Sequence, residues 1–369
     1  MKAVVMRQGR LICEAVARPV PGPGQVLVRT LACGICGTDL HALHHLPGFL
    51  DGMRRSGTPL PVDPDQAVIF GHEFCAEVLE YGGDGKGRFA PGTRVVGLPY
   101  VTGPNGAEYV GYSNRFPGGF AENMVLTDKL LFAVPEGLSN EHAALTEPMS
   151  VGAHAVARAA ISGPALVVVV GCGPIGLAVI AALKADGIGP VIGLDYSPGR
   201  RRFAEALGAD EVVDPAQEPI EAVWSRHRAG SKSRRAVVFE CVGRPGVAQS
   251  LVATAPRNAL LVVVGNALEA CTLDQVMAFN KELDIRFSMN FTAAEFQRTL
   301  RHIAEGDVDV GSILTGVVGP EQAMEAFDGL RDPERHAKMV ISFEVQGAAP
   351  APTGQDPMPE RLHETNVIA

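Results

Sequence analysis

The sequence predicts a two-domain α/β protein in which a doubly wound parallel sheet is inserted into a β-rich unit. The length of 369 residues points to two folded units, because single domains usually contain about 100–200 residues. The second observation is a change of pattern near residue 152, from short strands between Gly- and Pro-rich turns to alternating buried strands and amphipathic helices. Helical crossovers between parallel strands produce the second pattern, so we expect the parallel sheet there.

The β-rich unit is expected over residues 1–151, where short apolar stretches such as 25–30 and 93–97 lie between turn signals. The first strand of residues 152–287 is ALVVVV, which is followed by an alanine-rich helix, the strand VIGLD and a further helix. The later strands AVVFECVG, ALLVVVG and LDIRFSM repeat this rhythm. Six parallel strands with helical crossovers are what two successive mononucleotide-binding halves require.

After this sheet the chain is expected to return to the first unit. A helix is predicted over residues 293–305, followed by segments such as 338–345 that could rejoin the β-rich unit. The β-rich domain would then comprise residues 1–151 and 288–345. Residues 346–369 lack apolar periodicity and are rich in Pro and Ala, which favours a flexible tail over an ordered arm that bridges subunits.

The composition argues against several classes of function. The formal net charge of −9 argues against binding nucleic acid or anionic membranes, since phosphate binding needs a basic surface, and favours a small-molecule partner. The longest apolar runs fall short of the about 18 residues that span a bilayer, so no membrane helix is predicted. Arg7, Gln8 and Arg10 interrupt the N-terminus before a signal-like apolar segment, which favours a cytoplasmic protein. Seven scattered cysteines, an odd number, indicate reduced thiols.

A glycine-rich turn follows the first strand of the predicted parallel sheet and opens a helix. Its residues are Gly171, Cys172, Gly173, Pro174, Ile175 and Gly176. Glycines in this context allow a tight turn and close approach of a pyrophosphate, while the helix N-terminus faces the negative charge. The next strand ends in Asp195, nineteen residues after Gly176, where a carboxylate can accept hydrogen bonds from both ribose hydroxyls. A Rossmann-type dinucleotide site is therefore better supported than an ordinary glycine turn.

The same carboxylate bears on which dinucleotide binds. Asp195 would repel the 2′-phosphate of NADP, so NAD is favoured. The run Arg200, Arg201 and Arg202 is the counter-evidence, because arginines just after this strand can hold a 2′-phosphate. At least two of the three are better interpreted as a solvated helix face. We therefore expect NAD, with Arg200 among the residues that contact it.

The stretch CGICGTDLH, from Cys33 to His41, concentrates two thiols, a hydroxyl, a carboxylate and an imidazole in nine residues. By itself the C-x-x-C pair could be redox-active or half of a four-thiolate zinc site, but the chain has no second C-x-x-C. Further donors follow in GHE, with His72 and Glu73, and in TEP, with Glu147. A catalytic zinc needs three protein ligands and one open position, and thiolate, imidazole and carboxylate supply that set.

With these motifs the chain resembles the zinc-containing medium-chain alcohol dehydrogenase family, from about residue 2 to residue 345. The matching segments are ACGICGTDLH, GHEF, PGGFAE, LTEPMSVGAHA, the glycine-rich turn, KELDI and KMVISF. The resemblance implies a β-rich GroES-like catalytic domain with one catalytic zinc, and Cys36 and His72 as zinc ligands. Glu147 matches the third ligand position, as in sorbitol- and butanediol-type members. In some polyol enzymes Glu73 ligates instead, and the residue that matches Glu147 holds a zinc-bound water.

The resemblance also implies roles for neighbouring groups. Thr38 would take the hydroxyl proton of the substrate and relay it through the cofactor ribose towards His41 and solvent. Asp39 would orient the imidazole of His72, and Lys338 matches a basic position that contacts the cofactor pyrophosphate. Thr38 could instead be a turn hydroxyl and His41 a surface residue, but their spacing within the motif favours function.

Three features depart from the family pattern. The stretch 99–119, where many relatives carry a four-cysteine structural zinc, contains no cysteine. Its aromatic residues would pack this lobe instead: Tyr100, Tyr109, Tyr112 and Phe116. Gly37 stands where some relatives place an arginine on the pyrophosphate. The segment 44–68 is longer than in the commonest members and resembles the longer loop of butanediol-type enzymes, which would shape the substrate pocket.

The expected reaction is the reversible oxidation of a secondary alcohol or polyol to a ketone, with NAD as hydride acceptor and one zinc per chain. We expect a homo-oligomer, either a dimer or a tetramer. Two alternatives share the fold. A zinc-free quinone or enoyl reductase would leave the set of Cys36, His72 and Glu147 unexplained. A non-catalytic binding protein would leave the relay residues unexplained.

Overall fold

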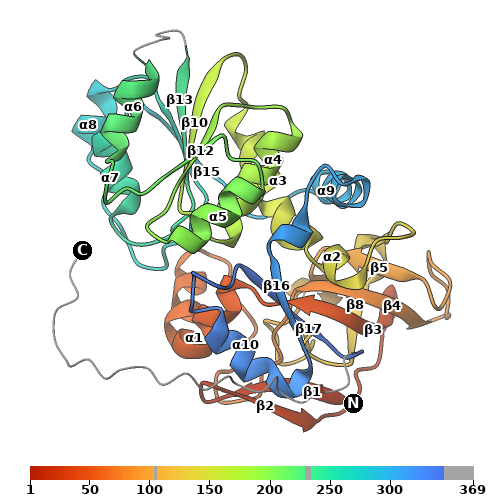
Figure 1. Cartoon of the computed structure of the whole chain (residues 1–369). Helices are drawn as coiled ribbons and strands as arrows, with labels where there is room; N and C mark the ends of the chain where they lie inside the picture. The colour runs from red at the N-terminus through yellow and green to blue at the C-terminus, as the bar shows by residue number, and fades with distance from the viewer. Residues whose placement is uncertain (104–105, 229–233, 345–369) are drawn as a thin grey trace, which may run out of the picture.

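The chain folds into two regions, which lie one above the other in Figure 1. The computed structural model describes residues 1–103, 106–228 and 234–344. The upper region contains a six-stranded sheet, and the lower region contains a seven-stranded sheet with two-stranded sheets beside it. The tail predicted over 346–369 lies outside the described residues. None of the helices within the described ranges combines the length and the apolar character that crossing a bilayer requires.

All strands of the six-stranded sheet run parallel. They are β10 Ala165–Val170, β11 Val191–Leu194, β12 Glu211–Val213, β13 Arg235–Glu240, β14 Leu260–Val263 and β15 Asp284–Phe287. The spatial order β12-β11-β10-β13-β14-β15 changes direction at β10. The crevice beyond the carboxyl ends of the strands at such a reversal is the usual ligand site of this sheet type. The parallel sheet predicted from the sequence pattern is confirmed.

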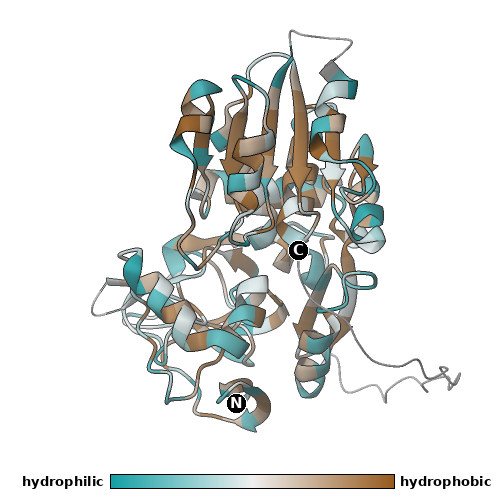
Figure 2. Cartoon of the chain, turned by 90° about the vertical axis from the view of Figure 1, so that its left-hand side faces the viewer, coloured by the Kyte–Doolittle hydropathy of each residue, from teal (hydrophilic) through white to brown (hydrophobic). Residues whose placement is uncertain are grey.

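Helices pack against both faces of this sheet. Successive residues of a strand point to opposite faces, so they enter two different cores. Val167 and Val169 belong to one core, and Leu166 and Val168 belong to the core on the other face, together with Trp224. Figure 2 shows these apolar strands between helices of mixed polarity. The helices around the sheet are α3 Thr146–Ala159, α4 Pro174–Ala185, α5 Pro198–Ala206, α6 Ile220–Arg228, α7 Val247–Thr254 and α8 Gln275–Asn280. Helix α9, Ala293–Glu305, packs against α3.

Strands from distant parts of the chain build the seven-stranded sheet. They are β3 Gln25–Gly34, β4 Glu73–Tyr81, β5 Arg94–Gly97, β8 Asn123–Thr127, β9 Leu131–Ala133, β16 Leu314–Val318 and β17 Lys338–Ser342. Strand β17 pairs antiparallel with β3, and Ile341 lies opposite Cys33. Strand β3 also pairs with β4, where Gly34 lies opposite Glu73. The end of β3 and the starts of β4 and β17 therefore meet at one end of these three adjacent strands.

Helix α1, Gly37–Arg55, occupies the first part of the segment 44–68, for which a long loop was expected. A capping box starts the helix: Cys36 Sγ accepts from the Thr38 N–H, and the Asp39 carboxylate accepts from the Cys36 N–H. Pro47 and the non-helical backbone of His45, with φ −138° and ψ 37°, kink it. The remaining elements are β1 Lys2–Arg7, β2 Arg10–Ala15, β6 Tyr100–Gly103, β7 Gly106–Tyr109, α2 Asn140–Ala144, α10 Ala323–Gly329 and the 3-10 helices Asp128–Leu130, Val310–Ser312 and Pro320–Gln322.

Candidate active site

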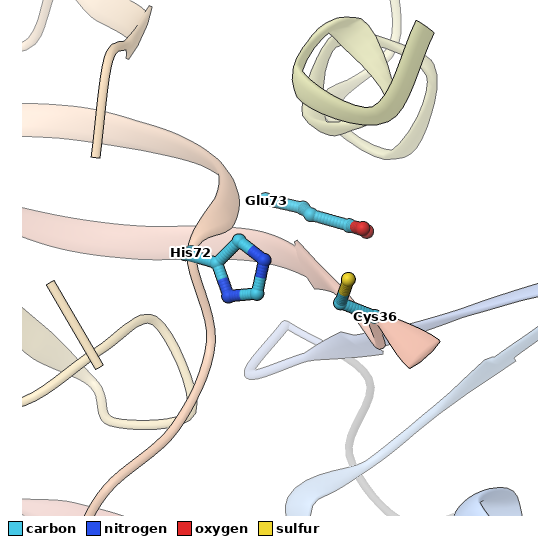
Figure 3. A group of neighbouring side chains, drawn as sticks. All are labelled: Cys36, His72 and Glu73. Atoms are coloured by element: carbon cyan, nitrogen blue, oxygen red, sulfur yellow. The ribbon is translucent and has the colours of Figure 1, made fainter. Parts of the chain in front are cut away.

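Three potential metal ligands meet where β3 ends and β4 and α1 begin. Cys36 is the N-cap residue of α1, and His72 and Glu73 lie at the start of β4. One ligand atom from each of the three residues lies within 4.8 Å of the other two. Figure 3 shows the three side chains gathered beside one another. His72 and Glu73 are buried whereas Cys36 is half-buried, so the group is not sealed from solvent.

The donor set and its unpaired atoms fit a zinc ion. Thiolate, imidazole and carboxylate are the ligands that zinc takes in proteins. His72 Nδ1 and Glu73 Oε2 are buried atoms that have no hydrogen-bond partner among the described residues. Burial raises the pKa of the Cys36 thiol, and the neighbouring Glu73 charge raises it further, while Lys338 opposes both. A nearby cation would favour the thiolate form, which is the form that binds metal.

Glu147 borders this group from the first turn of α3. Its carboxyl group is buried, and this burial is the main cause that raises its pKa to about 7; the charge of His72 opposes the shift and the charge of Glu73 adds to it. Within the part of the chain that the structure describes, Glu73 and not Glu147 belongs to the group within 4.8 Å. Glu73 therefore belongs to the close group, whereas Glu147 lies within reach of the charges of His72 and Glu73.

Lys338 is buried and bonds directly to Glu73. Its Nζ donates to Glu73 Oε1 at 2.5 Å and to the carbonyl oxygen of Ile35 at 2.9 Å. Losing one partner of such a buried pair typically destabilises a fold by about 3–5 kcal/mol, because the other charge is left unpaired. Sequence reasoning missed this ion pair, since 265 positions separate the two residues. A contact of Lys338 with the cofactor pyrophosphate stays a prediction.

Asp39 lies close to His72. The Asp39 carboxylate is fully buried, accepts from the Tyr112 hydroxyl at 2.6 Å and from the Cys36 N–H at 3.0 Å, and lies 3.6 Å from His72 Nδ1. The last separation exceeds a normal hydrogen bond, so the contact is a loose one. Burial is the largest influence and raises the pKa of Asp39, whereas His72 and Tyr112 favour the charged form.

Thr38 and His41 lie on the first turns of α1, beside the metal ligands. Their separation of three positions places them on the same side of the helix. The backbone N–H of Thr38 points to Cys36 Sγ at 3.5 Å, and its side chain is half-buried. His41 is largely exposed. Partial desolvation of its ring and the neighbouring His45 lower its pKa, so the imidazole is neutral at pH 7 and can accept a proton. The ring centroids of His41 and His45 lie 5.3 Å apart.

The cysteine-free lobe over 99–119 is packed by its aromatic residues. Tyr100 and Tyr109 meet edge to face with centroids 5.0 Å apart, and Tyr109 and Tyr112 lie 5.6 Å apart. Tyr112 and Phe116 are buried. The rings of Tyr109 and Tyr112 also lie 5.4 Å and 5.6 Å from the ring of His72, so the lobe forms one wall of the site.

Three polar contacts at this lobe were not predicted. Buried Glu108 accepts from Ser113 Oγ at 2.8 Å and lies 3.2 Å from Arg115 Nη1, which ties the lobe together. Asn290, in a left-handed backbone conformation with φ +60°, donates to the Tyr100 hydroxyl oxygen at 3.1 Å. Burial and the charge of Glu147 raise the pKa of Tyr100. The Tyr100–Asn290 contact thus joins the lobe to the segment after β15 near the candidate site.

The glycine-rich turn adopts the geometry that a pyrophosphate needs. Gly171 has φ +89°, and a Cβ on Gly176 would collide with the carbonyl oxygen of Gly171. Gly173 is the N-cap residue of α4, and Pro174 starts the helix. Gly173, Pro174 and Ile175 are partly exposed, so the turn is accessible.

Asp195 lies against this turn at the end of β11. Its Oδ2 accepts from the Cys172 N–H at 2.8 Å, and its Oδ1 accepts from the Ser197 N–H at 2.9 Å. Tyr196, which follows β11, and Val242, which follows β13, come after the two strands that flank β10, and 71% and 40% of their surface is accessible. Neither residue was predicted from the sequence, although an aromatic residue directly after the predicted ribose carboxylate is visible there.

The three consecutive arginines have different contacts. Arg201 donates to the carbonyl oxygens of Asp195 and Tyr196, and Arg202 donates to the carbonyl oxygen of Glu334. Arg200 lies 3.7 Å from Asp195 Oδ2. Two of the arginines are therefore engaged by backbone carbonyls, and Arg200 is the one next to the predicted ribose carboxylate.

Comparisons with known proteins agree with both halves of this arrangement. A family described as "Alcohol dehydrogenase GroES-like domain" matches residues 22–136, and one described as "Zinc-binding dehydrogenase" matches residues 174–305. Sorbitol dehydrogenase of Bacillus subtilis (strain 168) is 31% identical over 346 residues, which cover 89% of this chain and 93% of that protein. The (R,R)-butanediol dehydrogenase of the same organism is 36% identical over 248 residues, covering 65% of this chain and 69% of that protein.

Comparison with solved structures supports the same family. The crystal structure of 2R,3R-butanediol dehydrogenase from Bacillus subtilis superposes with a TM-score of 0.78 at 28% identity, covering 92% of this chain and 99% of that one. The GroES-like catalytic part and the Rossmann-type part expected from the sequence are both supported. The chain therefore belongs to the zinc-containing medium-chain alcohol dehydrogenase family, in its sorbitol and butanediol dehydrogenase branch.

Proposed function

We propose that this chain is a zinc-dependent dehydrogenase that transfers hydride between a secondary alcohol or polyol and NAD, giving a ketone. The observation that carries the proposal is the meeting of Cys36, His72 and a buried carboxylate beside a half-buried threonine hydroxyl. Relatives named sorbitol, (R,R)-butanediol and erythritol/L-threitol dehydrogenase support a substrate with more than one hydroxyl group. Residues 1–151 with 288–345 would form the catalytic domain, and residues 152–287 the cofactor domain.

In this proposal Cys36, His72 and Glu147 hold the zinc. Glu73 is the weaker candidate, because one of its oxygens already bonds to the Lys338 ammonium. A bound zinc ion would act as a Lewis acid on the substrate oxygen. Glu147, with a pKa of about 7 when no cation is present, would then be held as the carboxylate.

The chain's own residues would move the proton. Thr38 lies at the start of α1 next to Cys36, where its hydroxyl would accept the substrate proton. His41, neutral at pH 7 because its pKa is lowered, would receive the proton after its passage through the cofactor ribose and deliver it to solvent. The wall formed by Tyr100, Tyr109 and Asn290 offers hydroxyl and amide groups to a second substrate hydroxyl.

An alcohol panel tests the proposed activity directly. We expect the zinc-loaded protein to reduce NAD with vicinal diols or sugar alcohols and to be slower with simple primary alcohols. A chelated sample should lose this activity. Turnover of quinones or enoyl substrates by a metal-free sample, without any alcohol activity, would replace the proposal with the zinc-free alternative.

We predict one zinc per chain, which elemental analysis measures. A structural zinc needs four closely spaced thiolates, and residues 99–119 contain none. Glu147→Gln should reduce the zinc content below one, whereas Glu73→Gln should retain it if Glu147 is the ligand. Chelation should remove activity with a modest loss of stability, because the lobe is packed by aromatic residues and the Glu108 contacts. A reproducible content of two zinc ions would contradict the assignment.

For the cofactor, we predict a higher kcat/KM with NAD than with NADP. Asp195 accepts hydrogen bonds from the chain on both oxygens beside the glycine-rich turn, which supports a role in which it would bind ribose hydroxyls and repel a 2′-phosphate. Asp195→Ala should narrow the difference between NAD and NADP by removing the carboxylate that repels the 2′-phosphate. If the unmodified enzyme prefers NADP, the arginine run, and not Asp195, determines the cofactor preference.

We propose that the chain forms a homo-oligomer through the edge of its parallel sheet. Strand β15 is one of the two edge strands, and exposed apolar side chains lie on α8 (Phe279), at the end of β15 (Phe287) and just after it (Met289). A second copy of the chain would cover them. Phe287→Glu should shift the molecular mass measured by light scattering towards the monomer, and an unchanged mass would place the interface elsewhere.

A further inference from the structure

A second carboxylate, Glu334, lies beside the predicted adenosine site although it comes from the segment between α10 and β17. Its Oε1 accepts from Ser197 Oγ at 2.6 Å, and its Oε2 accepts from the Gly199 N–H at 2.8 Å. Ser197 also donates its backbone N–H to Asp195 Oδ1 at 2.9 Å. One residue therefore bonds to both carboxylates, which brings Glu334 next to the group that discriminates between NAD and NADP.

The position of Glu334 is held by several contacts. Arg202 Nη2 donates to its carbonyl oxygen at 3.2 Å, and its backbone N–H donates to Asp332 Oδ1 at 3.0 Å. Gly199 allows the close approach, because a Cβ there would lie 2.5 Å from the Cα of Glu334. The hydrogen bond from Ser197 lowers the pKa of the Glu334 carboxyl group, so it is charged at neutral pH.

These contacts occupy the positions that a phosphate would need. The N-terminus of a helix and a nearby hydroxyl attract anions, and α5 offers the Gly199 N–H and the Ser197 hydroxyl shortly after the predicted ribose carboxylate. Glu334 already fills both the Ser197 hydroxyl and the Gly199 N–H. An incoming 2′-phosphate would have to displace this carboxylate or bind beside its charge.

We propose that Glu334 is a second determinant of cofactor choice, which excludes the 2′-phosphate of NADP by occupying the N-terminus of α5. The inference rests on the proposed dinucleotide-dependent function. It assigns the NAD preference to two carboxylates, Asp195 and Glu334, that come from segments 139 positions apart. Arg200 remains the cation that a 2′-phosphate would find once both charges are removed.

A repulsive role and a purely structural role of Glu334 predict different changes in NADH and NADPH binding. If Glu334 only tethered its segment to α5, its loss would weaken NADH and NADPH binding by the same factor. If it repels the 2′-phosphate, neutralising it should strengthen NADPH binding and leave NADH binding nearly unchanged. Repulsion between charges near the surface is screened by salt, so the gain should shrink at high ionic strength.

The full-length protein is titrated with NADH and with NADPH, and the fluorescence of the reduced nicotinamide gives the Kd of each nucleotide. Glu334→Gln retains the size of the side chain and should lower the Kd for NADPH about tenfold, with a change of less than about twofold for NADH. Glu334→Asp retains the charge and should retain the unmodified preference. Adding Asp195→Ala to Glu334→Gln should reverse the preference. Glu325→Gln, which removes the same charge from the exposed face of α10, is the matched control.

The possible outcomes separate this inference from the proposed function. Binding of neither nucleotide by the unmodified protein would overturn the dinucleotide function and this inference with it. Two results would overturn this inference alone. In the first, the protein binds the nucleotides but Glu334→Gln leaves the ratio of NADH to NADPH affinity unchanged. In the second, Glu325→Gln changes that ratio as much as Glu334→Gln does. Because binding is measured without an alcohol, neither result depends on knowing the substrate.

Discussion

Replacing Cys36 with Ser or His72 with Ala is expected to remove both zinc and alcohol turnover while NADH binding stays within about twofold. The two side chains belong to the metal group at the end of β3 and the start of β4, whereas the glycine-rich turn and Asp195 belong to the parallel sheet. Loss of an ion that contributes several kcal/mol of charge stabilisation lowers the rate by about 10³-fold or more. Zinc analysis, steady-state kinetics and NADH titration measure the three quantities.

A matched cysteine provides the control. Cys271 is exposed and lies between β14 and α8, so Cys271→Ser should retain zinc and activity. His72→Ala also removes the ring that packs against Tyr109 and Tyr112, and a thermal melt shows how much of its effect is a loss of fold. Full activity in a Cys36→Ser protein that contains no zinc would refute the metal mechanism.

Replacing Thr38 with Val is expected to lower the rate of hydride transfer about 10²–10⁴-fold at neutral pH while zinc is retained. Valine keeps the shape of threonine and removes the hydroxyl that would accept the substrate proton. The contact from this residue to Cys36 Sγ uses the backbone N–H, so it survives the change. Single-turnover measurement of NADH formation separates the chemical step from product release.

The conservative variant makes this prediction specific. Thr38→Ser restores a hydroxyl and should recover most of the rate. A relay through a hydroxyl also predicts that the Thr38→Val protein recovers partly as the pH rises, because hydroxide in solvent can replace the lost acceptor. An unchanged rate for Thr38→Val at pH 7 would mean that the proton leaves by another route.

Much of the fold was predictable because its signals are local. The six parallel strands follow from short apolar runs separated by helical segments, and the structure contains them in the order that two mononucleotide-binding halves require. The helix over 293–305 is also confirmed, where Thr292 and Glu295 form a capping box. The segment 44–68 was less predictable, because Pro47 and two histidines obscured a helix that tertiary packing of Leu43, Leu46 and Phe49 stabilises.

The candidate site was predictable in its donors but not in their pairing. Cys36 and His72 come from motifs in which residue type and spacing specify metal chemistry. Nothing local indicated that Glu73 would bond to Lys338, because that contact depends on β17 lying beside β3 and β3 beside β4. The position of Glu73 also requires the glycine opposite it, since a Cβ on Gly34 would collide with the carboxylate.

The sequence by itself determined the two kinds of sheet, the glycine-rich turn and the zinc-type donors, because contiguous patterns dictate backbone conformation and chemistry at short range. Only the tertiary structure decided which carboxylate stands nearest Cys36 and His72, and which groups neutralise it. It also decided that Glu334 reaches Ser197 across 137 positions. The physical reason is that such contacts depend on strand register and on how distant segments pack, neither of which the periodicity of a single segment encodes.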